Sequence, residues 1–192
     1  MIGGKLVYVV IPARGGSKRL LRKNIYPVCG KSMIGWSIDA CKKSKYIDSV
    51  YVSSEDQEIL DVSKEFNAKI INRPNCLSED HVYKQEAIVD ATNQILNSSD
   101  INPHIVISLQ ANSPQVNSFD LDSAIEKFIK FDRNELISVN EALIQNAAFR
   151  IMKLDYVFQK TLSTKCGVYV TNYMDIHTID DVQLVENILL GD

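Results

Sequence analysis

LVYVVIPARGGSKRLLRKNI, residues 6–25, is the stretch around which this chain is organised. Its opening residues, Leu6 to Ile11, are largely apolar and β-favouring, and they predict a buried strand that stops at Pro12. A strongly basic loop with two glycines follows at once. Because many folds bind phosphate groups with such a loop at the end of a buried strand, we expect this loop to bind a triphosphate.

The composition is that of an ordinary globular chain. With 192 residues, 45% of them hydrophobic and 23% charged, the sequence fits a single domain over residues 1–192. No apolar run reaches the length of a membrane span and no basic-then-apolar leader opens the chain, so we expect a cytoplasmic protein with no membrane partner. The four cysteines are scattered without a CxxC pair, which favours reduced thiols over disulfides or a zinc site.

The charge of the chain is unevenly distributed. The net charge is −3, but residues 1–38 contain seven Lys and Arg residues and no Asp or Glu, so the remainder carries −10. Five of the seven cations lie between Arg14 and Lys23. Nucleic-acid-binding proteins are more often basic overall or along a whole face. One cationic loop on an acidic body therefore indicates a small polyanion as ligand, and no nucleic acid is expected as a partner.

Helical and strand patterns alternate along the rest of the chain. Helices are expected at residues 31–45, directly after 54–57, and at 80–96, 118–131 and 178–190. Their expected caps are Ser32, a capping box at Ser54, Ser118 and a capping box at Thr178. Further strands are expected at residues 49–53, 69–72, 104–109, 136–139, 149–154 and 167–170. This alternation predicts an α/β fold, with a mainly parallel sheet covered by helices on both faces.

Ligands of such sheets bind beyond the carboxyl ends of the strands. The loops expected to share that rim are residues 13–24, 54–56, 73–79, 110–115 and 171–177. The first of them has neither Walker A spacing nor a GxGxxG fingerprint. It offers glycine amides that can approach an anion, the Ser17 hydroxyl, and the charges of Arg14 and Lys18. A solvated turn would explain these residues equally well.

The longer string IPARGGSK followed by RKNI closely resembles the opening signature of the cytidylyltransferases that make CMP-activated acidic sugars. These are the acylneuraminate, legionaminate and pseudaminate types and, more distantly, the CMP-KDO synthetases. Further matches follow in the family's order: VSSED at 52–56, RP at 73–74 with LSED at 77–80, SLQANSP at 108–114, and DIHT at 175–178. The resemblance implies a three-layer, Rossmann-like nucleotidyltransferase fold. It also implies transfer of CMP from CTP to a nonulosonic acid, with release of pyrophosphate, for a surface polysaccharide.

The same resemblance implies roles for individual residues. The phosphates of CTP would lie on Ala13, Arg14, Gly15, Gly16, Ser17 and Lys18. Arg14 and Lys18 would neutralise the triphosphate, and Asn24 and Arg73 would contact the cytidine. Gln110, Asn112 and Ser113 would bind the sugar acceptor. Asp175 and His177 would face Mg²⁺.

His177 stands where the family has an aspartate, and imidazole is a poor ligand for Mg²⁺. Four explanations are open: Asp175 alone with waters, help from Asp180 or Asp181, a softer metal such as Mn²⁺, or a His177 that simply precedes a helix cap. Other candidates have simpler explanations. Glu55 and Asp56 fit the capping box better than a metal site. His81 and His104 are expected to be structural or exposed, and Asp120 and Asp122 to lie in a helix's first turn.

The acceptor half departs most from the family pattern. The arginine that follows LLQPTSPL in relatives is absent, and residues 141–170 resemble a shortened form of the segment that binds the acidic sugar and builds the dimer. Lys160 and Lys165 are candidates to meet a carboxylate, although a solvated face explains each. A homodimer is expected from family habit alone. Two alternatives therefore stay open: a sugar-phosphate nucleotidyltransferase using another NTP, and a catalytically lapsed, nucleotide-binding partner subunit.

Overall fold

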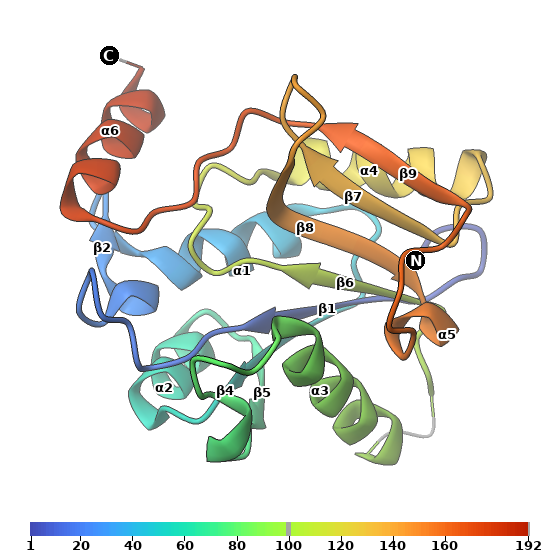
Figure 1. The fold of residues 1–192 in the computed structure, drawn as a ribbon, viewed down its shortest axis with the longest axis horizontal. Coiled ribbons are helices and arrows are strands. Elements are labelled where there is room, and N and C mark those ends of the chain that lie inside the picture. Colours follow the sequence, from blue (N-terminus) through green and yellow to red (C-terminus); the bar gives the residue numbers. More distant parts are fainter. Residues whose placement is uncertain (99–100, 192) are drawn as a thin grey trace.

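The computed structural model describes residues 1–98 and 101–191 and is built on a seven-stranded sheet in the order β5-β4-β1-β6-β8-β7-β9 (Figure 1). Its strands are β1 (Val7–Pro12), β4 (Ser49–Ser54), β5 (Lys69–Asn72), β6 (Ile105–Leu109), β7 (Glu135–Val139), β8 (Gln145–Lys153) and β9 (Cys166–Val170). Strands β2 (Pro27–Val28) and β3 (Lys31–Ser32) form a separate antiparallel pair. Only β8 runs antiparallel to its neighbours in the described sheet, which confirms a mainly parallel arrangement.

The helices cover both faces of the sheet. They are α1 (Met33–Lys43), α2 (Gln57–Glu65), α3 (Lys84–Ser98), α4 (Ser118–Lys130), α5 (Leu154–Val157) and α6 (Ile179–Leu190), with 3₁₀ turns at Lys23–Ile25 and Asn75–Leu77. One hydrophobic core joins the sheet to α1, α2 and α4, and a second joins it to α3 and α5. The three-layer α/β prediction is confirmed.

Strand β1 lies in the middle of this arrangement. It pairs in parallel with β4 and with β6, and Val7 to Ile11 are all buried. Val9 and Ile11 belong to the first core and Tyr8 and Val10 to the second, as the two-residue period of a strand requires. An apolar run without polar alternation is what a strand buried on both faces needs. The basic loop that follows β1 is therefore anchored at the centre of the sheet.

Several expected helix starts were wrong by a few residues. Asp56, rather than Ser54, caps α2, and its carboxylate accepts from the backbone amides of Glu58 and Ile59. Asn117 caps α4 in place of Ser118. Helix α3 begins at Lys84 and not at residue 80, because residues 78–83 form turns around the cavity described below.

Two further expectations are corrected by side-chain contacts. Ser32 does precede α1, but its hydroxyl makes no capping hydrogen bond. Asp120 lies in the first turn of α4 as expected, whereas Asp122 is buried and accepts from the Ser44 hydroxyl and the Lys45 amide, so it fixes the loop after α1. His104 accepts from the Leu6 amide and is structural, and His81 is exposed.

Helix α6 carries the capping box that the sequence predicts, between Thr178 and Asp181. Its buried residues Val182 and Val185 pack with Leu20, Val28 and Met33 in a third small core. Figure 1 shows α6 beside β2, next to the first part of the chain. This packing holds residues 175–177 close to the basic loop although they lie some 150 residues apart in sequence.

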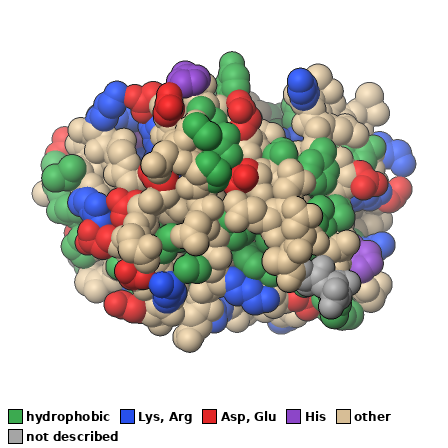
Figure 2. All heavy atoms as spheres, turned by 90° about the horizontal axis from the view of Figure 1, so that it is seen from below, with side chains coloured by type: hydrophobic (Ala, Val, Ile, Leu, Met, Phe, Trp, Pro, Cys, Tyr) green, Lys and Arg blue, Asp and Glu red, His purple; other side chains and the backbone are tan. Residues whose placement is uncertain are grey.

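Acidic and basic side chains are interspersed on the face that Figure 2 shows, which is the one carrying α2 and α3. All four cysteines are free thiols. Among the described residues, no helix combines the length and the hydropathy needed to cross a bilayer.

Candidate active site

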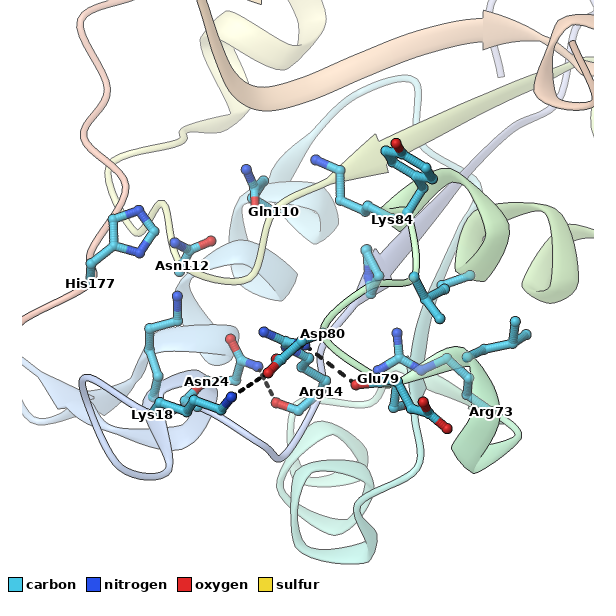
Figure 3. A pocket seen from close by; sticks show the side chains of 18 of the residues that line it. Arg14, Lys18, Asn24, Arg73, Glu79, Asp80, Lys84, Gln110, Asn112 and His177 are labelled. Carbon is cyan, nitrogen blue, oxygen red and sulfur yellow. Dashed lines mark hydrogen bonds and ion pairs between the residues drawn. The ribbon is translucent and has the colours of Figure 1, made fainter. Parts of the chain in front are cut away.

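A cavity of about 480 Å³ opens at the carboxyl ends of the parallel strands (Figure 3). Its lining combines loop residues from distant parts of the chain: Pro12, Arg14, Ser17, Lys18, Arg19, Leu20, Lys23, Asn24, Arg73, Leu77, Ser78, Glu79, Asp80, Val82, Tyr83, Lys84, Ala87, Gln110, Asn112 and His177. Eight of the residues that the sequence proposed for phosphate, base, sugar or metal are in this lining. The expectation that these loops share one rim is confirmed for residues 13–24, 73–79, 110–115 and 171–177, whereas residues 54–56 supply no lining residue.

Backbone hydrogen bonds between strand ends bring the loops together. The Ala13 amide donates to the Ser53 carbonyl over 3.0 Å, and the Arg73 amide donates to the Ser54 carbonyl over 2.9 Å. On the other side, the Ile176 amide donates to the Asn112 carbonyl over 3.0 Å, and the Asn112 side chain donates back to the Ile176 carbonyl. The first two bonds continue the pairing of β1, β4 and β5 into the loops, and the other two join the loop after β6 to the segment before α6.

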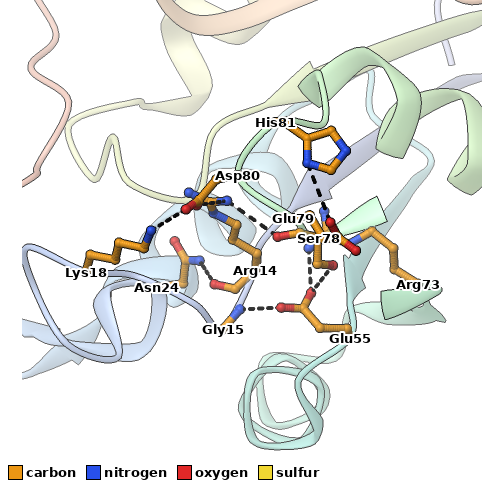
Figure 4. A network of polar contacts seen from close by, with 10 residues as sticks. All are labelled: Arg14, Gly15, Lys18, Asn24, Glu55, Arg73, Ser78, Glu79, Asp80 and His81. Carbon is orange, nitrogen blue, oxygen red and sulfur yellow. Dashed lines mark hydrogen bonds and ion pairs between the residues drawn. The ribbon is translucent and has the colours of Figure 1, made fainter. Parts of the chain in front are cut away.

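Glu55 organises the lower wall of the cavity (Figure 4). One carboxylate oxygen accepts from the Gly15 amide over 2.8 Å, and the other accepts from Arg73 Nη2 over 2.8 Å and from Ser78 Oγ over 2.6 Å. Burial acts to raise the pKa of Glu55, but the hydrogen bonds from Ser78, Gly15 and Arg73 together lower it below its usual value. A charged Glu55 therefore joins three loops, and this role replaces the metal-binding and capping alternatives.

The glycines of the basic loop do less than the sequence suggests. The Gly15 amide is used by Glu55, and neither Ala13, Gly15 nor Gly16 lines the cavity. Gly15 is needed for space: a Cβ built there would lie 3.0 Å from Asp56 Cβ and closer still to its carboxylate. The loop therefore presents Arg14, Ser17 and Lys18 to the cavity by means of side chains, whereas its glycine backbone packs against α2.

Asp80 closes over the two cations of the loop. Its carboxylate forms an ion pair with Arg14 at 2.8 Å and another with Lys18, and these cations lower the pKa of Asp80. All three side chains are exposed by more than a third of their area. Such pairs are worth less than about 1 kcal/mol each, so a stronger anion can displace Asp80. The loop thus binds an anion in this structure, and that anion is the protein's own carboxylate.

Asn24 and Arg73 both reach the cavity. Asn24 is buried and its amide donates to the Arg14 carbonyl over 2.8 Å, which fixes the turn of the basic loop. The Arg73 side chain is only 4% exposed and is held by Glu55. Both residues are therefore positioned before any ligand arrives, as a site that recognises a base requires.

Asp175 lies at the opposite side of the site. Its carboxylate accepts from Ser113 Oγ over 2.7 Å and from Gln110 Nε2 over 3.3 Å. Ser113 is fully buried and absent from the cavity lining, so it orients Asp175 instead of contacting a sugar. Gln110 and Asn112 do line the cavity.

His177 and Lys23 lie near Asp175. Burial lowers the pKa of His177, and the charges of Lys23 and Arg19 lower it further against the opposing effect of Asp175 and Asp181. Burial also lowers the pKa of Lys23, while Asp175 acts to raise it. Asp181 accepts from the amides of His177 and Thr178 and is therefore engaged in the helix cap.

The described residues hold no group of three or more His, Cys, Asp and Glu side chains suited to a metal ion. A single carboxylate is nevertheless a normal contribution to a Mg²⁺ site, since Mg²⁺ in nucleotide enzymes takes one or two carboxylates together with phosphate oxygens and waters. Asp175, half-buried at the rim, fits that pattern. It fits a metal that arrives with a nucleotide better than one stored by the protein alone.

Lys84 is the main functional candidate that the sequence did not reveal. It lines the cavity beside Gln110, whereas Lys160 and Lys165 do not, and Lys165 instead pairs with Asp132. Lys84 keeps an exposed surface, but desolvation by the surrounding cavity wall lowers its pKa, and Asp175 acts to raise it. The local sequence does not identify Lys84 as a site residue. A helix that starts at residue 80, as the sequence predicts, places Lys84 within the helix and not at its first position. In the structure Lys84 is the first residue of α3, next to the turns around the cavity.

Known proteins resemble this chain in both sequence and fold. A sequence model of the family described as "Cytidylyltransferase" matches residues 8–172. Pseudaminic acid cytidylyltransferase of Campylobacter jejuni subsp. jejuni serotype O:23/36 (strain 81-176) is 37% identical over 133 residues, covering 69% of this chain and 57% of the relative. N-acylneuraminate cytidylyltransferase of Oncorhynchus mykiss is 32% identical over 135 residues, covering 69% of this chain and 30% of the relative. The chain thus spans little more than half, or less, of these relatives' length.

Among solved structures, that of CMP:2-keto-3-deoxy-manno-octonic acid synthetase complexed with CTP aligns with a TM-score of 0.79 over 97% of this chain and 99% of the other, at 14% identity. A cytidylyltransferase from Leptospira borgpetersenii serovar Hardjo-bovis (strain JB197) aligns with a TM-score of 0.73 over 98% of this chain and 88% of the other, at 16% identity. At these identities the likeness establishes a common fold.

Proposed function

Because this chain belongs to the cytidylyltransferase family, we propose that its cavity binds CTP and that the protein transfers CMP to an acidic sugar with release of pyrophosphate. The observation that carries the proposal is the cavity itself. Residues from four of the five family-like motifs meet there, with Arg14 and Lys18 at one end and Gln110 at the other. Pseudaminic acid, N-acylneuraminate and 3-deoxy-manno-octulosonate are the acids in the relatives' names, and a nonulosonic acid is our proposed acceptor.

The chemistry needs charge neutralisation and alignment more than a covalent catalyst. An acceptor hydroxyl loses its proton to solvent as its oxygen attacks the α-phosphorus of CTP. The bond from that phosphorus to the α,β-bridging oxygen breaks, and this oxygen leaves with the pyrophosphate. Arg14 and Lys18 exchange Asp80 for the triphosphate and stabilise the charge that develops on the departing pyrophosphate. Ser17 adds a hydroxyl donor beside them.

Base selection falls to Asn24 and Arg73. Both are buried and preset by protein hydrogen bonds, so little conformational freedom is lost when a cytosine binds. Gln110 and Asn112 then orient the acceptor. Ser113 contributes indirectly, by holding Asp175.

For the metal we propose that Asp175 contributes one oxygen ligand to a Mg²⁺ bound with the triphosphate. Mn²⁺ is the alternative, since it is a softer ion than Mg²⁺ and would tolerate an imidazole ligand from His177 better. Such an ion supplies further neutralisation of phosphate charge. Asp181 is occupied by the α6 cap, which leaves Asp175 and His177, and Asp180 in the first turn of α6, as the candidates.

Pyrophosphate release with each NTP and a panel of acidic sugars tests the proposal directly. Turnover with CTP and a nonulosonic acid, lost in Asp175→Ala, is the expected result. Turnover with UTP or GTP in place of CTP would disprove the base assignment. Turnover restricted to phosphorylated acceptors would favour a sugar-phosphate nucleotidyltransferase, and CTP binding without pyrophosphate release would favour a lapsed partner subunit.

We also propose that residues 1–192 act as one nucleotidyltransferase domain, because one sheet extends from β5 to β9. Residues 141–170 are proposed as its shortened acceptor and dimerisation region, and none of those that the structure describes lines the cavity. A cytoplasmic location fits an enzyme that consumes CTP. A homodimer is supported by apolar side chains that β9 and the β7–β8 hairpin leave exposed, among them Leu143, Ile144 and Val170. Light scattering on the purified chain measures the oligomeric state.

A further inference from the structure

The cavity has two cationic ends, and only one of them is explained by a nucleotide. Arg14 and Lys18 follow β1, and Arg73 follows β5, so the proposed CTP site occupies the β5-β4-β1 half of the rim. The other half lies beyond β6, where Gln110 and Asn112 line the wall. Lys84 faces this second half, and Figure 3 shows its side chain extending toward Gln110.

Lys84 is free to bind a ligand. The ion pairs of the described residues engage Arg14, Lys18 and Arg73 but leave Lys84 without one. Its cationic neighbour Arg150 is engaged: Arg150 Nε donates to Glu135 over 3.0 Å and Nη1 donates to Gln85 over 3.1 Å. Lys84 is therefore an available positive charge at the β6 end of the cavity. Lys23, near Asp175, also lines the cavity without an ion pair among the described residues.

The backbone that carries Lys84 is held firmly. The next residue, Gln85, donates from Nε2 to the Val157 carbonyl over 2.6 Å and accepts from Arg150, which ties the first turn of α3 to α5 and β8. Ala87 and Ile88, in the following turn of α3, are buried in the core. A charged group on a fixed backbone at a cavity wall is suited to select a ligand by its charge.

Resting on the proposed function, we propose that Lys84 binds the carboxylate of the acidic sugar and so selects an anionic acceptor. The ammonium would hold the carboxylate at the β6 end of the cavity while Gln110 contacts the sugar's polar groups. A neutral sugar would leave Lys84 without a partner and bind more weakly, because a hydrogen bond between charged groups in a partly enclosed site contributes more than one in water. Lys84 is thus a specificity-determining residue for the acceptor. The charge of the departing pyrophosphate is stabilised by Arg14 and Lys18 at the opposite end of the cavity.

The test is a binding titration on the intact chain saturated with α,β-methylene-CTP, which cannot release pyrophosphate. The probes are pseudaminic acid and its methyl ester. For the unchanged protein, the acid should bind about 10-fold more tightly than the ester, or better. In Lys84→Gln the affinity for the acid should fall to that for the ester. The affinities for the ester and for the CTP analogue should change by less than about 3-fold. Lys84→Arg should retain most of the preference for the acid.

Lys160→Gln is the matched control, because it removes the same charge from an exposed lysine outside the cavity lining. It should behave as the unchanged protein. An unaltered preference for the acid in Lys84→Gln would overturn the inference. An equal loss of affinity for the CTP analogue would also overturn it, because it would mean that Lys84 contacts the phosphates of the nucleotide. A protein that binds the analogue but not the acid would also overturn it. Failure to bind the analogue at all would instead overturn the proposed function.

Discussion

Gly15→Ala should distort the basic loop by steric overlap. The alanine Cβ would lie 3.0 Å from Asp56 Cβ and Cγ, and closer to Oδ2, so the Asp56 side chain must move. That side chain caps α2 by accepting from the amides of Glu58 and Ile59, and it pairs with Arg22 at 3.0 Å. The substitution therefore disturbs a helix cap that lies outside the cavity.

The magnitude follows from those contacts. Loss of a helix cap costs about 1 kcal/mol, and the half-exposed pair with Arg22 adds about 0.5 kcal/mol at most. A loss of roughly 1–1.5 kcal/mol lowers the melting temperature of a chain of this size by about 2–6 °C. The Gly15 amide also shifts away from Glu55, so CTP should bind more weakly by about 3-fold or more.

Gly16→Ala is the matched control, because a Cβ at Gly16 would meet no atom within 4 Å. It should leave the melting temperature unchanged or raise it slightly, since alanine reduces the freedom of the unfolded chain. Thermal unfolding followed by circular dichroism and titration with CTP measure both effects. Equal behaviour of the two variants, in either direction, would refute the assignment of Gly15 to a packing role.

Three further outcomes are expected. Asp80→Asn should leave the melting temperature within about 2 °C and tighten CTP binding about 5-fold, because removing one nearby negative charge is worth roughly 1 kcal/mol; weaker binding in a calorimetric titration would mean that Asp80 assists the nucleotide. The lowered pKa of Glu55 means that its stabilisation is complete above its unfolded value of about 4.3 and is lost as the pH falls through the folded value, so Glu55→Gln should flatten the dependence of unfolding free energy on pH below 5 in urea titrations. An unchanged slope would contradict the network in Figure 4. Thr178→Ala should lower the melting temperature by about 2–4 °C by breaking the α6 capping box, and no change would show that α6 depends on its apolar packing alone.

Sequence pattern was a reliable guide where one local signal had one structural explanation. The run from Leu6 to Ile11 predicts a strand buried on both faces, and β1 is one. The Thr178 capping box is present as expected, because its two hydrogen bonds involve residues only three apart. Parallel pairing followed from the alternation of strands and helices. The loops that carry the site could then be placed on one rim without knowing any side-chain contact.

Local competition between polar residues explains the misplaced caps. Ser54, Asp56, Asn117 and Ser118 are all good capping residues, and the sequence does not say which backbone amides each one reaches. The helix start at Lys84 is set by the turn over the cavity, which is a tertiary feature. A helix drawn from residue 80 puts Lys84 on an ordinary helical face and so conceals it.

The sequence by itself determined the fold class, the rim and the family of the basic loop at residues 13–24, because periodicity and ordered motifs are local properties of the chain. Tertiary structure alone decided how that loop is used. Glu55 accepts a hydrogen bond from the Gly15 amide, and Asp80 forms ion pairs with Arg14 and Lys18. Lys84 faces the β6 end of the cavity without an ion pair to any residue that the structure describes. These contacts join residues between 40 and 66 positions apart, and which charges pair across such distances depends on the packing of the whole sheet.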